Sequence, residues 1–530
     1  MSSTAALRTE APPAARGAPG AGPAAVAIGW AVGVVSFAYL MSLPPTLNMA
    51  DESVVLYGAK RVYMGEAAYR DFFEFVAPGA FYLYALAYKI GGVSITSARV
   101  TTALLNALTA VCIYFLALRI AAVGEAVIAG LMVVAICVPV WNMASHHWIA
   151  TTMAAAAAAV LLAPGWQAST RARPTAAGFL AGILACTHQG RAVWLIAWLI
   201  VSVPLVTQTA APGRWRRCAR ELAWIAVGGA AICLPVFGYA LWRSSFAEMH
   251  YAMVTWVTIN YWAYNVGVAA WAAAPFPTMR TITWVRLLEA IPALLAVEAL
   301  WVLWTLARRG LGAVRLRLSL LLLALSAIAA IMYYPGIGHV AFITPFALVV
   351  FAGMVYRLRR VVPLHTRVGR AGVGLAWAAM LALVCGKLWT NREIVRMHTP
   401  IRFESAFGTL AGHPRQANLI AGLRANLPVS DDAPARLFAY PGDAWVYLAL
   451  PADNPTPFAL LRPIYNTPEQ NQSAIDLIER DPTIAVLVNT MFARNQDPML
   501  TYLNRRFGQP ILLPAMPWIL YKRPTPVPPS

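Results

Sequence analysis

The chain has 530 residues, of which 59% are hydrophobic and only 12% are charged. Soluble domains carry about 25% charged residues, so this composition excludes an ordinary soluble protein and indicates a polytopic membrane protein. The formal net charge is +19, a balance that nucleic-acid-binding proteins also show. Most of the arginines, however, lie in short loops between apolar segments, where positive charge sets membrane orientation. We therefore expect membrane lipids as neighbours and no nucleic-acid partner.

The N-terminal residues 1–22 are rich in Ala, Pro, Gly and Arg, which predicts a disordered cytoplasmic segment. The apolar segment that follows is longer than the core of a signal peptide, and no clear cleavage site comes after it. We therefore expect this segment to be a retained first membrane span.

Further apolar segments predict about eleven membrane spans in all. The expected spans cover residues 24–43, 97–118, 122–140, 147–163, 175–188, 191–208, 221–242, 284–306, 317–334, 339–356 and 371–389. With a cytoplasmic N-terminus, the arginine-rich loops all fall on the cytoplasmic side, and one span more or fewer would break this alternation. Because the Ala- and Arg-rich composition is typical of GC-rich bacteria, we expect a multi-pass protein of the bacterial plasma (inner) membrane.

Three regions then lie on the outer side, namely residues 44–96, 243–283 and 390–530. In the first of them, residues 54–64 and 80–90 predict amphipathic helices in the membrane interface. In the tail, three short apolar runs alternate with two helical patterns, which predicts a small α/β domain. The predicted strands are residues 435–440, 484–489 and 518–523, and the predicted helices are residues 468–481 and 498–507.

The predicted fold class is therefore an all-α polytopic membrane module followed by a small extracytoplasmic α/β domain. The membrane module is expected to cover residues 23–389, and the α/β domain is expected to cover residues 390–530. The near-continuous apolar run "IAVLV" in the tail is typical of a strand that is buried on both faces.

Two adjacent carboxylates, Asp51 and Glu52, follow the first predicted span. Such a pair at the outer mouth of a membrane protein can bind a cation or act as a general base. An acidic dipeptide after a span is also a common start of a solvated helix, in which Asp51 would serve as the N-cap. The dipeptide alone leaves both interpretations open.

The sequence around this pair runs "DESVVLYGAKRVYMGEAAYRDFFEFVAPG" and contains the patterns D-E, G-x-x-x-Y-x-D and E-x-x-x-P. It resembles the first outer loop of the GT-C superfamily of membrane glycosyltransferases. Within that superfamily it is most similar to the bacterial protein mannosyltransferases, the lipid A aminoarabinose transferases and the lipopolysaccharide-core galacturonosyl transferases. The span count and the outer α/β tail extend the resemblance over most of the chain.

The resemblance implies an inverting transfer of a sugar from a polyprenyl-phosphate donor to an acceptor hydroxyl on the outer face. Asp51 falls on the family's catalytic carboxylate, which acts as the general base, and Glu52 completes the acidic pair. Glu74 falls near a carboxylate that helps to bind metal in aminoarabinose transferases, so an optional divalent metal is expected at Asp51 and Glu74. Asp71 is either a further cavity residue or a structural one.

The sequence contains neither a P-loop nor a dinucleotide-binding glycine motif, so a nucleotide-binding site is not expected. The phosphate of a lipid-linked donor instead requires a cation at membrane depth. Arg191, between two apolar segments, is the first candidate, because a buried arginine there is costly unless it is paired. Its alternative is a snorkelling interface arginine. The stretch "FLAGILACTHQG" resembles a family segment that places His188 and Gln189 near the lipid phosphate, while Arg99 and His339 are further phosphate candidates.

Three more residues are candidates for the same cavity. His146 and His147 are adjacent, so on a helix their side chains point about 100° apart, and we do not expect them to bind one metal together. Glu289 lies near the outer end of its predicted span, whereas Glu298 is deeper and is expected to bond a neighbouring helix.

Two other function classes fit a polytopic membrane protein. One is a transporter or flippase of lipid-linked saccharides, a class that usually shows internal repeats, and we find no matched halves in this sequence. The other is a non-catalytic assembly protein that binds partners through its tail. The acceptor class stays open between a lipid, a glycan and a protein.

Overall fold

The structure of the chain is a computed structural model that describes residues 22–48, 51–164, 171–207, 213–261, 290–333, 336–361, 366–430, 432–462, 465–492 and 497–523. Three parts of the prediction lie outside the described residues. They are most of the disordered segment 1–22, residues 262–283 of the second outer region, and the candidate Glu289.

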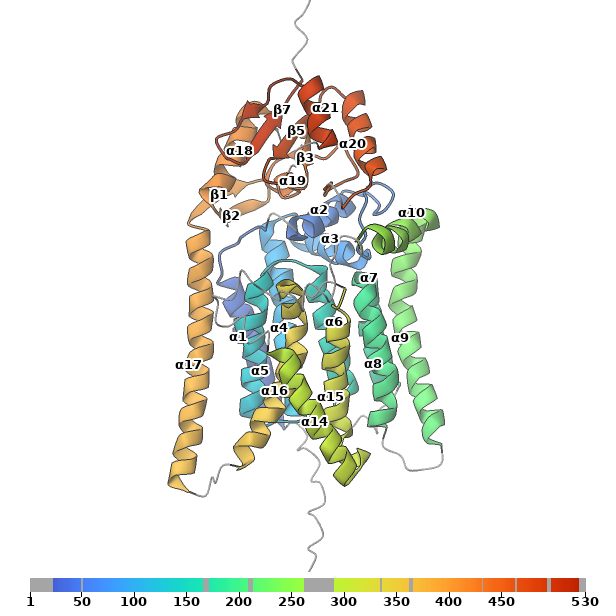
Figure 1. Cartoon of the computed structure of the whole chain (residues 1–530), viewed down its shortest axis with the longest axis vertical. Helices are drawn as coiled ribbons and strands as arrows, with labels where there is room; N and C mark the ends of the chain where they lie inside the picture. The colour runs from blue at the N-terminus through green and yellow to red at the C-terminus, as the bar shows by residue number, and fades with distance from the viewer. Residues whose placement is uncertain are drawn as a thin grey trace, which may run out of the picture.

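The long helices stand side by side in an upright bundle (Figure 1). Each predicted span coincides with a helix, and residues 122–140 coincide with three consecutive short helices. The bundle consists of α1 (Pro23–Met41), α4 (Ile95–Leu118), α5 (Val123–Met132), η1 (Val133–Cys137), η2 (Val138–Trp141), α6 (His146–Leu161), α7 (Ala172–Thr187), α8 (Gln189–Val206), α9 (Arg214–Arg243), α14 (Ile291–Arg309), α15 (Leu311–Ala329), α16 (Ile337–Val361) and α17 (Arg367–His398).

Among the described residues, nine helical segments are long and apolar enough to cross a membrane. The predicted spans that fall short of this length are α6 and α7, which have 16 residues each. Both occur where the sequence predicts them, and α6 lies in the interior of the bundle with most of its residues buried. The multi-pass membrane architecture is therefore confirmed, while the limits 23–389 and 390–530 remain predictions.

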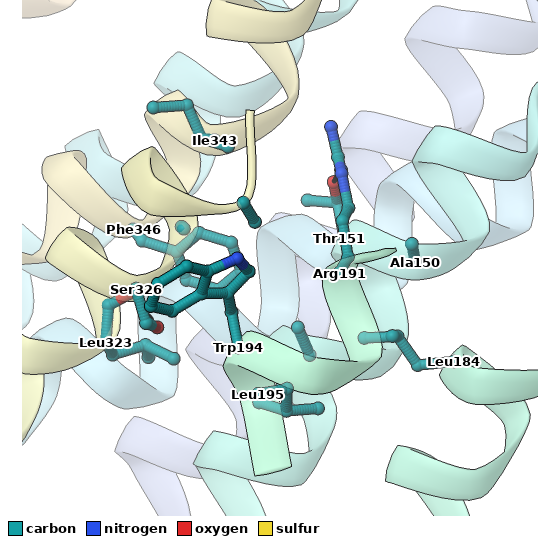
Figure 2. Close-up of a pocket in the computed structure, with 13 residues that line it drawn as sticks. Ala150, Thr151, Leu184, Arg191, Trp194, Leu195, Leu323, Ser326, Ile343 and Phe346 are labelled. Carbon is teal, nitrogen blue, oxygen red and sulfur yellow. Dashed lines mark hydrogen bonds between the residues drawn. The ribbon is translucent and has the colours of Figure 1, made fainter. Parts of the chain in front are cut away.

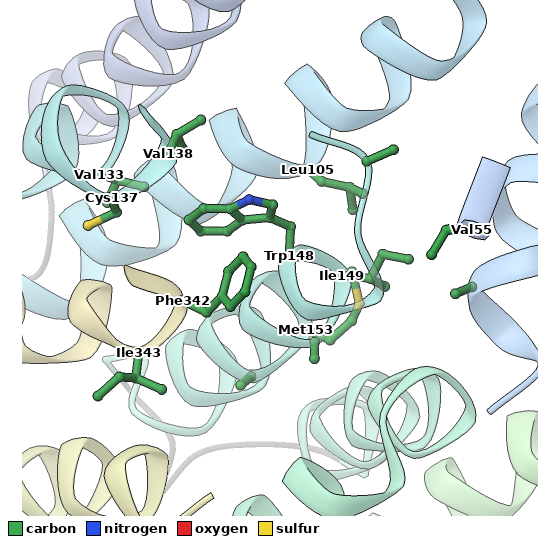
Figure 3. Close-up of a cluster of buried hydrophobic side chains, with 14 of the residues drawn as sticks. Val55, Leu105, Val133, Cys137, Val138, Trp148, Ile149, Met153, Phe342 and Ile343 are labelled. Atoms are coloured by element: carbon green, nitrogen blue, oxygen red, sulfur yellow. The ribbon is translucent and has the colours of Figure 1, made fainter. Parts of the chain in front are cut away.

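The centre of the bundle is a tightly packed apolar core around α6 (Figure 3). The ring of Trp148 packs edge-on against Phe342 of α16, with the ring centroids 4.9 Å apart. On the neighbouring helix α4, the hydroxyl group of Thr109 lies 2.8 Å from that of Thr152. Because α6 is fixed from both sides, the position of its N-terminus is fixed too.

Buried glutamates tie the bundle helices together through arginines. Glu125 of α5 pairs with Arg359 of α16 at 2.6 Å, and Glu298 of α14 pairs with Arg317 and Arg357. Charges within a membrane are costly unless they are paired, and here each acid meets a cation from another helix. The prediction that Glu298 bonds a neighbouring helix is confirmed.

Two short helices, α2 (Asp51–Tyr63) and α3 (Gly79–Gly91), lie across the end of the bundle that carries the tail (Figure 1). They correspond to the two predicted interface helices. Between α9 and the undescribed residues that follow Tyr261, the chain forms α10 (Phe246–His250) and the π-helical segments η4 (Tyr251–Thr255) and η5 (Val257–Tyr261).

The tail contains a five-stranded sheet with the strand order β4-β3-β5-β7-β6. Strand β3 runs parallel to β4 and β5, whereas β7 runs antiparallel to β5 and β6. Every residue of the central strand β5 is buried, as its apolar sequence predicts. The elements are β3 (Ala435–Tyr440), α19 (Val446–Ala449), β4 (Ala452–Asp453), α20 (Pro468–Arg480), β5 (Ala485–Asn489), α21 (Pro498–Arg506), β6 (Ile511–Leu512) and β7 (Trp518–Tyr521).

The sequence analysis missed the hairpin of β1 (Ile401–Ser405) and β2 (Gly408–Gly412) and the helix α18 (Pro414–Asn426) that follows it. The hairpin turns at Gly408, whose φ of 97° lies in the left-handed region that glycine adopts most easily. Each strand has only five residues, and β1 contains just two apolar residues, so the hydrophobic pattern is too short to predict a strand.

The tail docks directly on α2. The rings of Tyr57 and Tyr447 stack with their centroids 4.6 Å apart, and the Lys60 ammonium donates a hydrogen bond to the Tyr447 carbonyl at 2.8 Å. The loop before α3 joins the tail as well, because the Phe73 amide donates to the Pro457 carbonyl at 2.9 Å. Residues from the tail can therefore enter any site that is built on α2.

Helices α7 and α9 approach each other through two glycines. A methyl group at Gly178 would lie 1.9 Å from the carbonyl oxygen of Ile225, and one at Gly228 would lie 2.0 Å from that of Thr175. Neither distance is compatible with a side chain, so the two backbones are in direct contact, as small residues allow in membrane helices.

We predict that Gly228→Ala lowers the thermal unfolding temperature of the purified protein in detergent, since the new methyl group forces α7 and α9 apart. Overpacking of this kind costs about 1–3 kcal/mol. Gly238→Ala on the same helix is the matched control, because no atom lies within 4 Å of its added methyl group. Equal unfolding temperatures for the two variants would contradict the close contact of α7 and α9.

Candidate functional site

Asp51 is the first residue of α2, and its side chain is exposed to solvent. The protein around it nevertheless raises the pKa of its carboxyl group by desolvation, while the positive charge of Arg462 acts in the opposite direction. Arg462 belongs to the tail, so tertiary folding brings it to Asp51. A carboxylate that is accessible and has a raised pKa is suited to accept a proton.

Glu74 lies in the loop before α3 and is buried, with 7% of its surface exposed. Burial raises the pKa of its carboxyl group to about 7, and the negative charge of Asp51 adds to the shift. The backbone N–H groups of Phe75 and Val76 act in the opposite direction. The carboxyl group of Glu74 therefore responds to the charge of Asp51, so the two groups titrate together.

Glu52 is fully buried and takes part in a dense hydrogen-bond network. Its carboxylate accepts two hydrogen bonds from Arg99, at 2.7 and 2.9 Å, and one each from the amides of Asn48 and Ala144, at 2.8 and 2.6 Å. Arg99 also donates to the Thr46 carbonyl. Glu52 thus joins the start of α2 to α4 and to the turn before α6, and the guanidinium of Arg99 faces Glu52.

Asp71 stabilises a turn of the first loop. Its carboxylate pairs with Arg70 at 2.8 Å and accepts the Ala67 amide at 2.7 Å. The hydrogen bond from Arg70 is the main cause that lowers the pKa of Asp71. The turn also holds Tyr69, whose φ of 74° is rare for a residue other than glycine. This arrangement favours the structural role for Asp71.

Four histidines converge at the ends of the central helices. His146 and His147 begin α6, His188 lies between α7 and α8, and His339 lies in the first turn of α16. The ring centroids of His147 lie 4.0, 4.9 and 4.7 Å from those of His146, His188 and His339. The expectation that His146 and His147 diverge is wrong, because side-chain rotation at the first turn of α6 brings the two rings together.

Arg191 lies beside these histidines in the first turn of α8, with 6% of its surface exposed. Its Nη1 donates to the His147 carbonyl at 3.3 Å and to the Thr151 hydroxyl at 3.1 Å, and its guanidinium lies 5.3 Å from the centre of the Phe342 ring. Its Nε and Nη2 have no hydrogen-bond partner within the described parts of the chain. A buried guanidinium with free donors is a site for an anion.

Gln189 turns away from this cluster toward the first loop. Its amide nitrogen donates to the Phe75 carbonyl at 3.1 Å. It thereby connects the start of α8 to the residue next to Glu74. This hydrogen bond links the segment that carries His188 and Arg191 to the loop that carries Glu74.

An apolar pocket opens beside Arg191 (Figure 2). Its cavity volume is about 30 Å³, and the space amounts to about 350 Å³ when the open region at its mouth is included. Arg191 and Thr151 supply polar atoms, whereas the wall consists of aliphatic and aromatic side chains such as Leu195, Ile343 and Phe346. The pocket is therefore suited to a ligand with a charged head and an apolar chain.

A row of tyrosines connects the surroundings of the carboxylates to the histidine cluster. The ring centroids of Tyr465 and Tyr261 lie 6.1 Å apart, Tyr261 and Tyr333 are 6.1 Å apart, and Tyr333 is 5.9 Å from His339. Tyr465 lies in the field of both carboxylates, because the charges of Glu74 and Asp51 help to raise the pKa of its hydroxyl group. The sequence analysis missed Tyr465 and Arg462, since no local pattern connects the tail to α2.

Comparison with known proteins rests on solved structures, since no protein-family model and no curated protein matches the sequence. The chain is similar to the crystal structure of ArnT from Cupriavidus metallidurans bound to undecaprenyl phosphate. That similarity has a TM-score of 0.62 at 14% sequence identity and covers 94% of this chain and 97% of ArnT. The apo structure of the same protein gives a TM-score of 0.61 at 15% identity, with the same coverage. The chain therefore shares the fold of ArnT over nearly its whole length.

Proposed function

We propose that this protein transfers a sugar from a polyprenyl-phosphate donor to an acceptor hydroxyl on the outer face of the membrane, with inversion. The pocket beside Arg191 is the observation that carries the proposal, because it joins a buried cation to an apolar wall. The shared fold adds support, since the ArnT structure was determined with undecaprenyl phosphate bound.

The donor phosphate lies at Arg191 in this proposal. The free Nε and Nη2 of the guanidinium donate to phosphate oxygens, while the apolar wall receives the first isoprene units. His188 and His339 line the same end, since their rings lie within 4.9 Å of the His147 ring. As the sugar leaves, the phosphate gains negative charge, and the fixed guanidinium stabilises that charge.

Asp51 acts as the general base at the other end of the site. Its carboxylate takes the proton from the acceptor hydroxyl while the hydroxyl oxygen attacks the anomeric carbon. The bond from that carbon to the phosphate oxygen breaks on the opposite face, and the phosphate leaves with the electron pair. The row of tyrosines between Asp51 and Arg191 supplies aromatic faces and hydroxyl groups for the sugar.

Glu74 sets the charge state of Asp51 in this proposal. The negative charge of Asp51 helps to raise the pKa of Glu74, so in this proposal the two carboxyl groups hold a proton or an optional divalent cation. Such a cation would be held by carboxylate oxygens of Asp51 and Glu74 and would neutralise their charge. Glu52 positions Asp51 through its bonds to Arg99 and to the neighbouring backbone.

We predict that the rate of sugar transfer rises with pH through about 7, because the pair of Asp51 and Glu74 loses its last proton as Glu74 titrates near that value. Glu74→Gln removes the group that titrates near pH 7, so the rising limb shifts to the lower pH at which Asp51 alone loses its proton. Release of undecaprenyl phosphate from a panel of undecaprenyl-phosphate hexoses and pentoses, in native membranes that contain the acceptor, measures the rate. A rising limb that Glu74→Gln leaves in place would contradict the coupling.

In the same assay, Asp51→Asn loses transfer by about 10²-fold or more at every pH and keeps donor binding. A transporter or flippase needs no base, so undiminished movement of the lipid-linked sugar by Asp51→Asn would favour that alternative. The variant also tests the helix-capping interpretation, since asparagine caps a helix as well as aspartate does.

We predict that Arg191→Gln weakens binding of undecaprenyl phosphate at least about tenfold, because a buried charged contact is worth about 2 kcal/mol or more. Binding of undecaprenol, which lacks the phosphate, stays unchanged, since the apolar wall is intact. Leu195→Trp fills the pocket and weakens both ligands. Equal losses for both lipids in Arg191→Gln would rule out recognition of the phosphate by this residue.

We predict that Arg99→Gln destabilises the fold by about 3–5 kcal/mol, because it leaves the buried Glu52 carboxylate without its cation. The double variant Glu52→Gln/Arg99→Gln regains part of the unfolding temperature in detergent. If Glu52 positions the base, the double variant keeps its KM for the donor and loses kcat. A double variant with normal kcat would limit Glu52 to a structural role.

A further inference from the structure

Three histidines of the cluster form a nitrogen-only group, and the proposed reaction assigns no bond-making or proton-transfer step to any of them. One ring nitrogen from each of His146, His147 and His188 lies within 4.8 Å of the other two. His147 and His188 are 7% and 8% exposed. This group differs from the carboxylate pair of Asp51 and Glu74 in both ligand type and position.

Each of these rings has a buried nitrogen without a hydrogen-bond partner in the part of the chain that the structure describes. The atoms are Nδ1 of His146, Nδ1 of His147 and Nε2 of His188. A buried polar atom without a partner costs about 1–3 kcal/mol. Three such atoms side by side indicate a missing ligand, since folded proteins pair nearly all their buried polar groups.

The backbone holds the three rings in place. Ser145 caps α6, with its hydroxyl group accepting the His147 amide at 3.1 Å. The ring of His147 stacks on Phe342 with a centroid distance of 4.7 Å, and the His188 amide donates to the Leu184 carbonyl at 2.7 Å. The backbone that carries the three side chains is thus fixed, at the start of α6 and at the residue between α7 and α8, as a metal site requires.

We propose that His146, His147 and His188 bind one divalent metal ion of the zinc class. Neutral imidazole nitrogens suit Zn²⁺, Co²⁺ and Ni²⁺, whereas Mg²⁺ and Ca²⁺ select oxygen ligands. A tetrahedral zinc ion with Zn–N bonds of about 2.0–2.1 Å holds its ligand nitrogens about 3.3 Å apart. Small rotations of the three side chains close the remaining distance.

The three histidines leave one position of a tetrahedral ion open. Arg191, whose Nη1 donates to the His147 carbonyl, lies beside the histidine cluster with its free Nε and Nη2. A second cation next to a metal favours an anionic fourth ligand, and a phosphate oxygen meets both charges. The identity of this fourth ligand rests on the proposed function, whereas the metal site does not.

The metal content of the purified protein tests the site. The full chain, carrying a tag without histidine, is dialysed against Zn²⁺ and then against metal-free buffer, and zinc is measured by mass spectrometry. We expect about one zinc ion per chain in the wild type and in His250→Gln, which changes an exposed histidine outside the cluster. His147→Gln and His188→Gln lose it. Asp51→Asn/Glu74→Gln keeps it, which separates this site from a carboxylate site.

A second measurement covers variants that fold poorly. Zn²⁺ added to the metal-stripped protein raises the unfolding temperature of the wild type and of His250→Gln, because a ligand that binds the native state stabilises it. The temperature of His188→Gln stays constant. Absence of zinc from the wild type, or zinc retained by His188→Gln, would overturn the proposal.

Cobalt substitution tests the open position. Co²⁺ in the wild type gives the visible absorption of a tetrahedral site, and inorganic phosphate changes that spectrum, with a weaker response in Arg191→Gln. A spectrum unaffected by phosphate would overturn the anionic fourth ligand. Full sugar transfer by the metal-stripped protein would show that the reaction does not need the metal, and the proposed function would stand. Bound zinc in a protein that transfers no sugar would support the metal site and contradict the proposed function.

Discussion

The buried pair of Glu52 and Arg99 is the contact on which the rest of the site depends. Through this one carboxylate, the segment before α2, helix α4 and the turn before α6 are bonded together. The same contact fixes the neighbouring Asp51 and the helix start that carries His146 and His147. A buried ion pair with every oxygen satisfied is rigid, because losing one partner leaves a charge in a dry environment.

Adjacent acids acquire different roles from their surroundings. Glu52 is saturated by a guanidinium and two backbone amides, so both of its carboxylate oxygens are occupied by structural contacts. Asp51, one residue earlier, is exposed and is only partly balanced by Arg462, and burial and Asp51 together raise the pKa of Glu74 to about 7. Enzymes separate proton-accepting groups from structural ones in this way. The D-E dipeptide therefore marks two functions and not one shared site.

The sequence predicts those parts of the fold that local patterns encode. Hydrophobic length and arginine placement locate the helices, and short apolar runs locate β3, β5 and β7. The first-loop motif likewise leads to Asp51 and Glu74. Contacts between distant segments have no local signal, so Arg462 and Tyr465 beside α2 could not be found from the sequence. The convergence of His146 and His147 was missed for another reason, since helical periodicity describes the backbone and not side-chain rotation.

The distribution of charge along the site sets the direction of the proposed reaction. Arg191 and the imidazoles lie at the ends of bundle helices beside the apolar pocket, whereas Asp51 begins α2, the helix that lies beneath the tail (Figure 1). A leaving phosphate is stabilised at the first end, and a proton is accepted at the second. Because the tail covers α2 through Tyr57, Tyr447 and Phe73, an acceptor must reach Asp51 along the boundary between the tail and the first loop. In the proposed reaction, the lipid donor and the acceptor therefore approach from different phases, and the sugar changes carrier at the tyrosine row between them.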